Sequence, residues 1–273
     1  MSYSSEFKRN MITFKEDIYM SYFVYNNKHI FYNEIGSGTP LFFLHGNTAS
    51  SNMYAEFSKK YSQKFKVILI DFLGHGKSDR LSKFPTDLWF YEAQQVIAFL
   101  KEKQYTDVSI IGSSGGAIVA INVALEAPEF VSKVIADSFE GENANKDFTA
   151  NLLKDREEAK ADSNARAFYA YMHGSDWEKV VDNDTATIIR HENETGCFFH
   201  RPLNLLKADI LLTGSKEDKF MYSLSDNYFE NVYGEMLKKI GHGKMFLFDT
   251  GDHPAMITNF ENFYNISLDF LMQ

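Results

Sequence analysis

SIIGSSGGAIVAI, residues 109–121, places a cluster of glycines and serines between two apolar segments. The apolar run before the cluster is typical of a strand that is buried on both faces. The small and apolar residues that follow, up to residue 127, predict a buried helix. Gly112 and Gly116 frame Ser114 in the pattern G-x-S-x-G, and glycines at these places let a strand turn sharply into a helix. The stretch therefore predicts a strand–turn–helix unit with Ser114 at the turn.

This position makes Ser114 a candidate nucleophile. Such a turn holds the hydroxyl above the edge of the sheet, and the backbone N–H groups at the start of the helix favour a developing negative charge there. Ser113 does not fit the pattern, because it would need glycine at position 111, where the chain has isoleucine. The alternative interpretation is a strand–helix turn of small residues that has no chemistry.

Apolar runs elsewhere in the chain predict a mostly parallel sheet. Residues 19–35 predict a hairpin around Asn26 and Asn27, because asparagine tolerates the positive φ of a tight turn. Further buried strands are expected at residues 40–46, 65–76, 107–112, 131–137, 208–214 and 244–250. Helical patterns fall between them at residues 52–63, 86–103, 115–127, 224–239 and 255–271. This alternation predicts βαβ units, with ligands bound beyond the carboxyl ends of the strands.

Residues 140–204 interrupt the alternation, because they contain no convincing buried strand and read as polar and helical. We expect them to form a helical cap or lid, inserted between two parts of one core domain, residues 1–139 and 205–273. The aromatic residues Phe168, Tyr171 and Trp177 have two possible roles. They either line an apolar substrate pocket or pack within the cap itself.

The composition disfavours several kinds of partner and site. With 28 basic and 37 acidic residues the net charge is −9, which argues against nucleic acid and anionic membranes as main partners. Cys197 is the single cysteine, so no internal disulfide forms. The first 17 residues contain no apolar segment of signal-peptide length, and no window is long enough to span a bilayer. We expect a soluble, cytoplasmic monomer or homodimer that acts on a small molecule, without metal or cofactor.

Five motifs, in this order along the chain, resemble those of the α/β-hydrolase superfamily. They are LFFLHGN (41–47), ILIDFLGHGKSD (68–79), IIGSSGG (110–116), ILLTGSKED (210–218) and FDTGDHPAM (248–256). The resemblance covers nearly the whole chain from about residue 20. It implies a mostly parallel eight-stranded α/β sheet flanked by helices, with a helical cap insertion, and a catalytic triad in the order Ser, acid, His.

A serine hydroxyl is a weak nucleophile, so it needs a base, and the base needs an acid that orients it. His253 follows the last expected strand, which is where the superfamily places its base. His242 precedes that strand and is expected at the opposite end of the sheet. His45 and His75 belong to the HG and GHG loops and are expected to be structural. The triad is therefore expected to use Ser114 and His253.

The resemblance places the acid after ILLTG and favours Asp218. Glu217 remains an alternative, because the spacing from Gly214 to Asp218 is one residue longer than the commonest pattern. Asp137 is a third candidate, because some relatives carry their acid after the preceding strand. The resemblance also assigns the oxyanion hole to two backbone N–H groups, those of Asn47 and Gly115.

The expected function is that of a serine hydrolase, which cleaves a small carboxylic ester or related acyl compound through an acyl-enzyme. The same triad also serves thioesterases, C–C bond hydrolases, lactonases and cofactor-free haloperoxidases. HGNTASS (45–51) resembles a loop of haloalkane dehalogenases, but those enzymes have Asp where this chain has Ser114, so dehalogenation and epoxide hydrolysis are disfavoured. An alternative of another class is a non-catalytic binding or receptor protein on the hydrolase scaffold.

Overall fold

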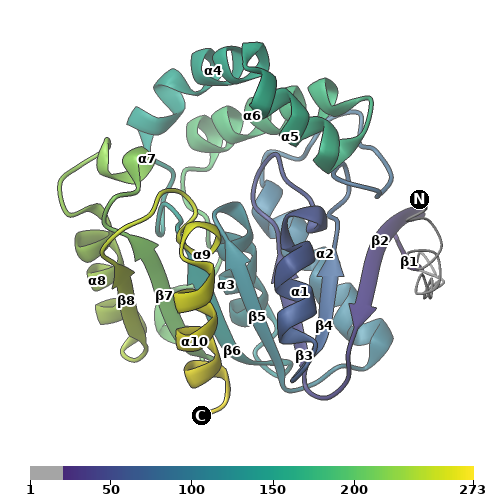
Figure 1. The fold of residues 1–273 in the computed structure, drawn as a ribbon, viewed down its shortest axis with the longest axis vertical. Coiled ribbons are helices and arrows are strands. Elements are labelled where there is room, and N and C mark those ends of the chain that lie inside the picture. The colour runs from purple at the N-terminus through teal and green to yellow at the C-terminus, as the bar shows by residue number, and fades with distance from the viewer. Residues whose placement is uncertain (1–20) are drawn as a thin grey trace, which may run out of the picture.

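A computed structural model describes residues 21–273, and its eight strands form one sheet (Figure 1). The strands are β1 (Ser21–Tyr25), β2 (Lys28–Ile35), β3 (Pro40–Leu44), β4 (Lys66–Ile70), β5 (Val108–Ser113), β6 (Val131–Asp137), β7 (Asp209–Ser215) and β8 (Lys244–Phe248). Their order is β1-β2-β4-β3-β5-β6-β7-β8. Strand β2 is antiparallel to β1 and β4, and all other neighbours are parallel. The predicted mostly parallel sheet of eight strands is confirmed.

The hairpin between β1 and β2 turns at Asn26 and Asn27, as predicted. Both residues have positive φ, 50° and 61°, which asparagine adopts more readily than most residues. The first two residues of the predicted hairpin lie outside the described residues. The N-terminal stretch 1–17, in which the sequence indicates no signal peptide, lies outside them as well.

The helices cover both faces of the sheet and one of its edges. They are α1 (Ala55–Tyr61), α2 (Leu88–Lys103), α3 (Gly115–Glu126), α4 (Lys146–Ala161), α5 (Ser163–His173), α6 (Trp177–Glu194), α7 (Lys219–Tyr222), α8 (Tyr228–Ile240), α9 (Ala255–Thr258) and α10 (Phe260–Leu271). Two short 3-10 helices, η1 (Ser51–Tyr54) and η2 (Leu203–Leu205), precede α1 and β7. Within residues 21–273, none of the helices has the length and apolar character needed to cross a membrane.

Side chains that alternate along each strand divide the core into two layers. On β3, Phe42 belongs to the cluster that α2, α3 and α8 cover, whereas Leu41 and Phe43 belong to the cluster under α1 and α10. Every residue of β5 is buried, as expected for a central strand with helices on both faces. This packing fixes the direction in which the loop after β5 leaves the sheet.

The expected single helix at 255–271 is instead two helices, α9 and α10, separated at Asn259. The backbone of Asn259 is not helical, with φ −117° and ψ 34°, and its Nδ2 donates a hydrogen bond to the carbonyl of Thr250. An asparagine side chain that bonds to nearby backbone competes with the helix. Periodicity alone did not reveal this break.

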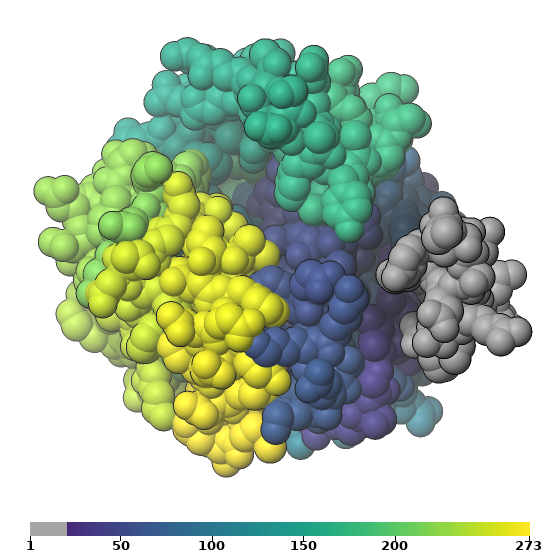
Figure 2. All heavy atoms as spheres, in the orientation of Figure 1, coloured from purple at the N-terminus to yellow at the C-terminus, as the bar shows by residue number. Residues whose placement is uncertain are grey.

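Helices α4, α5 and α6 form a connected group, the α4–α6 segment (residues 146–194), between β6 and β7. In Figure 1 the group lies across the top of the molecule, over the ends to which the parallel strands point. Side chains cap two of these helices, because Asn145 Oδ1 accepts from the N–H of Asp147, and Asp162 Oδ1 accepts from that of Asn164. The space-filling view shows the segment as an arch with a hollow beneath it (Figure 2).

Candidate active site

The turn between β5 and α3 has the geometry of a strained elbow. Ser114 lies between them with φ 54° and ψ −124°, a conformation that residues with a side chain rarely adopt. A Cβ atom at Gly112 would lie 2.1 Å from the carbonyl oxygen of Gly116, and one at Gly116 would lie 2.0 Å from that of Leu44. Only glycine fits at these two places, which explains the G-x-S-x-G spacing.

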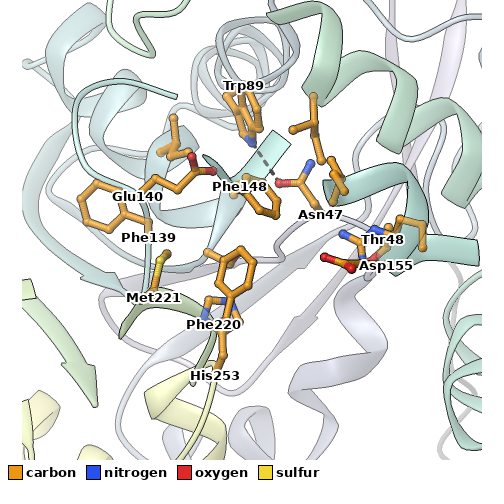
Figure 3. Close-up of a pocket in the computed structure, with 16 residues that line it drawn as sticks. Asn47, Thr48, Trp89, Phe139, Glu140, Phe148, Asp155, Phe220, Met221 and His253 are labelled. Carbon is orange, nitrogen blue, oxygen red and sulfur yellow. Dashed lines mark hydrogen bonds between the residues drawn. The ribbon is translucent and has the colours of Figure 1, made fainter. Parts of the chain in front are cut away.

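Ser114 lines a cavity of about 360 Å³ beneath the α4–α6 segment. Ser113 does not line it, because Ser113 is fully buried and its hydroxyl lies 3.5 Å from Asp137 Oδ2. The cavity wall is mainly apolar, and its apolar residues are Trp89, Ile118, Phe139, Phe148, Leu152, Ile188, Phe220 and Met221. Figure 3 shows most of these side chains around a central space that His253 enters from the opposite side to Trp89.

His253 lines the same cavity and contacts a buried carboxylate. Its Nδ1 lies 2.8 Å from Oδ2 of Asp218, whose side chain is inaccessible to solvent. The other oxygen of Asp218 accepts a hydrogen bond from the N–H of Met221 at the start of α7, which fixes the orientation of the carboxylate. With Nδ1–H donating to Asp218, the second ring nitrogen of His253 is left as a proton acceptor.

The two other candidate acids do not contact the imidazole. Glu217 is exposed. Asp137 is buried, and it accepts hydrogen bonds from Thr213 Oγ1 (2.7 Å) and from the N–H of Met256 (3.1 Å). Burial raises the pKa of Asp137 to about 6. Asp137 therefore holds the loop after β8 in place but is not hydrogen-bonded to His253.

The other histidines named from the sequence do not line the cavity that Ser114 lines. His242 bonds to the carbonyl of Leu206 (2.9 Å). His45 is buried, with Nδ1 bonded to the carbonyl of Gly46 and Nε2 accepting from the N–H of Phe72. Burial lowers the pKa of His45 to about 3, so the ring is neutral. Within residues 21–273, no group of three or more His, Cys, Asp or Glu side chains is placed to hold a metal ion.

The structure brings Asn47 and Gly115 next to each other and next to Ser114. A Cβ atom at Gly115 would lie 2.2 Å from Asn47 Oδ1, and one at Gly46 would lie 3.0 Å from the Cβ of Ser114. Both ends of the Asn47 side chain are engaged, since Oδ1 accepts from Trp89 Nε1 (3.2 Å) and Nδ2 donates to an acid on α6 (2.8 Å). Gly115 begins α3, where backbone N–H groups lack partners within the helix.

The aromatic residues that the sequence offered for the pocket do not line it, and that prediction is corrected. Phe168 and Tyr171 are exposed, and Trp177 stacks on Tyr169 with ring centroids 5.6 Å apart. Instead Phe148 and Leu152 of α4 and Ile188 of α6 form the wall. The physical reason lies in how each helix is rotated about its own axis. Sequence spacing predicts an amphipathic helix but does not show which neighbour its apolar face contacts.

Three acidic residues in or near the pocket carried no motif and were missed: Asp155 of α4, which lines the cavity, Glu140 and Asp184. Glu140 lines the cavity just after β6, with Oε2 accepting from the N–H of Asn145, and burial raises its pKa to about 7. Asp184 of α6 is the acid that binds the Asn47 side chain, and it is fully buried. No signal in the sequence distinguishes Asp184 from the other polar residues of α6, because burial is not visible in one sequence.

A model of the alpha/beta hydrolase fold family matches residues 39–246. The chain belongs to this family. It is 23% identical over 269 residues to a 2-hydroxy-6-oxo-6-phenylhexa-2,4-dienoate hydrolase of Comamonas testosteroni, covering 89% of this chain and 91% of that protein. It is 34% identical over 109 residues to a proline iminopeptidase of Heyndrickxia coagulans, a match that spans 39% of this chain and 37% of that protein.

Among solved structures, the enol-lactonase of Burkholderia xenovorans LB400 superposes with a TM-score of 0.73 at 13% identity. The match covers 93% of this chain and all of that one. At this identity the likeness shows the fold alone. It agrees with the α/β-hydrolase resemblance predicted from the motifs, which the family match confirms.

Proposed function

We propose that the protein is a serine hydrolase that cleaves a small carboxylic ester or related acyl compound through an acyl-enzyme. One observation carries the proposal: Ser114, on a strained elbow, lines the same cavity as His253, which is hydrogen-bonded to the buried Asp218. A poised serine, a histidine and a buried carboxylate are the three parts that activate a hydroxyl near neutral pH.

In the proposed first half-reaction, Ser114 Oγ attacks the substrate carbonyl while His253 takes the hydroxyl proton. The tetrahedral oxyanion accepts hydrogen bonds from the backbone N–H groups of Asn47 and Gly115. The intermediate then collapses, and the leaving alcohol departs with the proton that His253 returns. The charge of Asp218 stabilises the imidazolium that exists between these two proton transfers.

In the second half-reaction a water molecule gives a proton to His253 and attacks the acyl-enzyme. The oxyanion forms again in the same place and collapses to release the acid, with Ser114 recovering its proton. The α4–α6 segment acts in this proposal as a cap over the core formed by the rest of the chain. Its apolar wall, with Phe148, Leu152 and Ile188, favours a substrate whose acyl or alcohol group is hydrophobic.

A second candidate is cleavage of a bond next to a free amino group, and Glu140 is the observation that favours it. An ionised Glu140 carboxylate on the cavity wall would attract an ammonium group. The carboxylate of Asp155 and the guanidinium of Arg156 line the same cavity. The similarity to a proline iminopeptidase points the same way. Comparison of p-nitrophenyl butyrate with aminoacyl p-nitroanilides separates the two candidates.

Labelling with a fluorophosphonate, followed by mass spectrometry of the adduct, tests the serine. We expect one adduct, on Ser114, that is lost in Ser114→Ala and strongly slowed in His253→Ala. Ser113→Ala is the matched control, because it removes the neighbouring hydroxyl outside the cavity and should leave labelling unchanged. Absence of an adduct on folded wild-type protein would favour a binding protein on the hydrolase scaffold.

A further inference from the structure

The carboxylate of Asp184 joins the α4–α6 segment to the loop that follows β3. It is fully buried on α6 and accepts three hydrogen bonds from side chains and backbone of the core. Oδ1 accepts from Asn47 Nδ2 (2.8 Å), and Oδ2 accepts from the N–H of Thr48 (2.6 Å) and from His75 Nε2 (3.2 Å). Each oxygen is therefore committed to a donor in a loop on the opposite side of the interface.

Asp184 is charged despite its burial. Burial by itself would raise the pKa of Asp184, but the hydrogen bond and the charge interaction with His75, together with Arg156 and the N–H of Thr48, hold the pKa below its ordinary value. A charged acceptor forms stronger hydrogen bonds than a neutral one. The three donors therefore bind a buried carboxylate. Water can replace this carboxylate as their acceptor only if the α4–α6 segment separates from the core.

Thr48 is held by the α4–α6 segment at both of its backbone groups. Its N–H donates to Asp184 of α6, and its carbonyl accepts from His173 Nε2 of α5 (3.0 Å). His173 in turn accepts at Nδ1 from the N–H of Gly76, which requires the neutral ring, and burial lowers the pKa of His173 to about 3. Thr48 has φ 56°, an unfavourable value for a β-branched residue, so outside contacts must stabilise the turn.

We propose that Asp184 is a positioning residue for the oxyanion hole, and that the loop of residues 46–48 takes its working shape only while the α4–α6 segment is docked. This role rests on the proposed function of Ser114. Asn47 supplies one oxyanion N–H, and its side chain is clamped between Trp89 of α2 and Asp184 of α6. Oxyanion donors must lie within about 2.7–3.1 Å of the developing charge, so a small shift of this loop matters.

Asp184→Asn is the informative variant, because it keeps the shape but removes one acceptor. Whichever way the amide is turned, its NH₂ group faces a donor, either Asn47 Nδ2 or the N–H of Thr48. We expect kcat on a p-nitrophenyl ester to fall about 10- to 100-fold, with KM changed less than about threefold, because the lost interaction acts on the transition state. A merely structural role would lower the amount of folded enzyme and leave the kcat of the folded fraction unchanged.

Asp182→Asn is the matched control. Asp182 lies on the same helix, but its side chain is exposed and pairs with Lys160. We expect wild-type kcat and KM for it. In addition, an alkyl boronic acid, whose tetrahedral adduct places an oxygen in the oxyanion hole, should bind Asp184→Asn at least about tenfold more weakly, while the carboxylic acid product binds as before.

Hydrogen exchange provides a measurement that does not depend on catalysis. In Asp184→Asn we expect the backbone N–H of Thr48 to exchange at least about tenfold faster than in wild type, and in Asp182→Asn at the same rate. Unchanged exchange, or unchanged kcat with unchanged boronate affinity in the folded variant, would overturn the role of Asp184. Absence of fluorophosphonate labelling in wild type would instead overturn the proposed function, whatever the exchange shows.

Discussion

Asp218 and His253 lie 35 positions apart in the chain, yet their side chains meet at 2.8 Å, with Asp218 completely buried. The two residues follow β7 and β8, which are parallel neighbours in the sheet. Parallel pairing brings the carboxyl ends of both strands to one edge, and the two loops meet there. The hydrogen bond to Met221 then leaves a single oxygen of Asp218 facing the imidazole.

Asp218→Asn should lower kcat about 10³- to 10⁴-fold with little change in KM. The N–H of Met221 would retain the amide oxygen, so the NH₂ group would face His253 Nδ1 and favour the tautomer that has its proton on Nε2. That tautomer cannot accept the proton of Ser114. Steady-state kinetics on a p-nitrophenyl ester measures the loss. Glu217→Gln is the control. An equal loss of kcat in both variants would mean that Asp218 is not the acid that acts on His253.

Phe148→Ala should shift the preference of the enzyme toward longer acyl chains. The ring centroids of Phe148 and Phe220 lie 4.8 Å apart, and those of Phe220 and His253 lie 5.4 Å apart. Removing the Phe148 ring therefore enlarges the cavity beside the reacting atoms. The measurement is kcat/KM across p-nitrophenyl esters from acetate to decanoate. Phe168→Ala, on the exposed side of α5, should leave the profile unchanged. A uniform loss at every chain length in Phe148→Ala would indicate lost stability instead.

Glu140 should make the protein less stable as the pH rises from about 4.5 to about 7. Its pKa is raised by burial from an ordinary value of 4.5 to about 7, so the folded state binds the proton more tightly than the unfolded state. This cost is absent below pH 4.5, grows through the window and is complete above pH 7. Glu140→Gln removes the ionisation but keeps an oxygen for the N–H of Asn145.

The free energy of unfolding in urea, measured from pH 4.5 to 8 for both proteins, tests this. The difference between them is the useful quantity, because Asp137, with its raised pKa, contributes with the same sign in both proteins and cancels. We expect Glu140→Gln to gain stability relative to wild type as the pH rises. A difference that stays constant over the whole range would mean that Glu140 has an ordinary pKa.

Gly116→Ala and Gly234→Ala should change stability in opposite directions. At Gly116 a Cβ atom would meet the backbone carbonyl oxygens of Leu44 and His45. We therefore expect the free energy of unfolding to fall by about 1–3 kcal/mol. At Gly234, inside α8, nothing lies within 4 Å of the new Cβ, and the alanine should stabilise the helix by about 0.5–1 kcal/mol. Urea denaturation measures both, and equal stability of the two variants would contradict the elbow packing.

The sequence by itself predicted where the strands fall along the chain and the tight turn after β5 on which Ser114 lies. These features are local, because apolar runs predict buried strands and only glycine fits beside a turn as tight as the one at Ser114. The sequence also shows that His253 follows the last strand. Loops that follow the strands of a parallel sheet lie at one edge, so His253 is expected at the same edge as Ser114.

Tertiary structure alone decided which acid meets the imidazole and which residues surround the cavity. Glu217 and Asp218 are neighbours in sequence, and only the start of α7 turns Asp218 inward. Phe168 and Tyr171 face solvent while Phe148 faces the cavity, because the rotation of each helix is set by what it packs against. Asp184 contacts a loop more than a hundred residues away, and burial of that kind follows from packing, which no local pattern records.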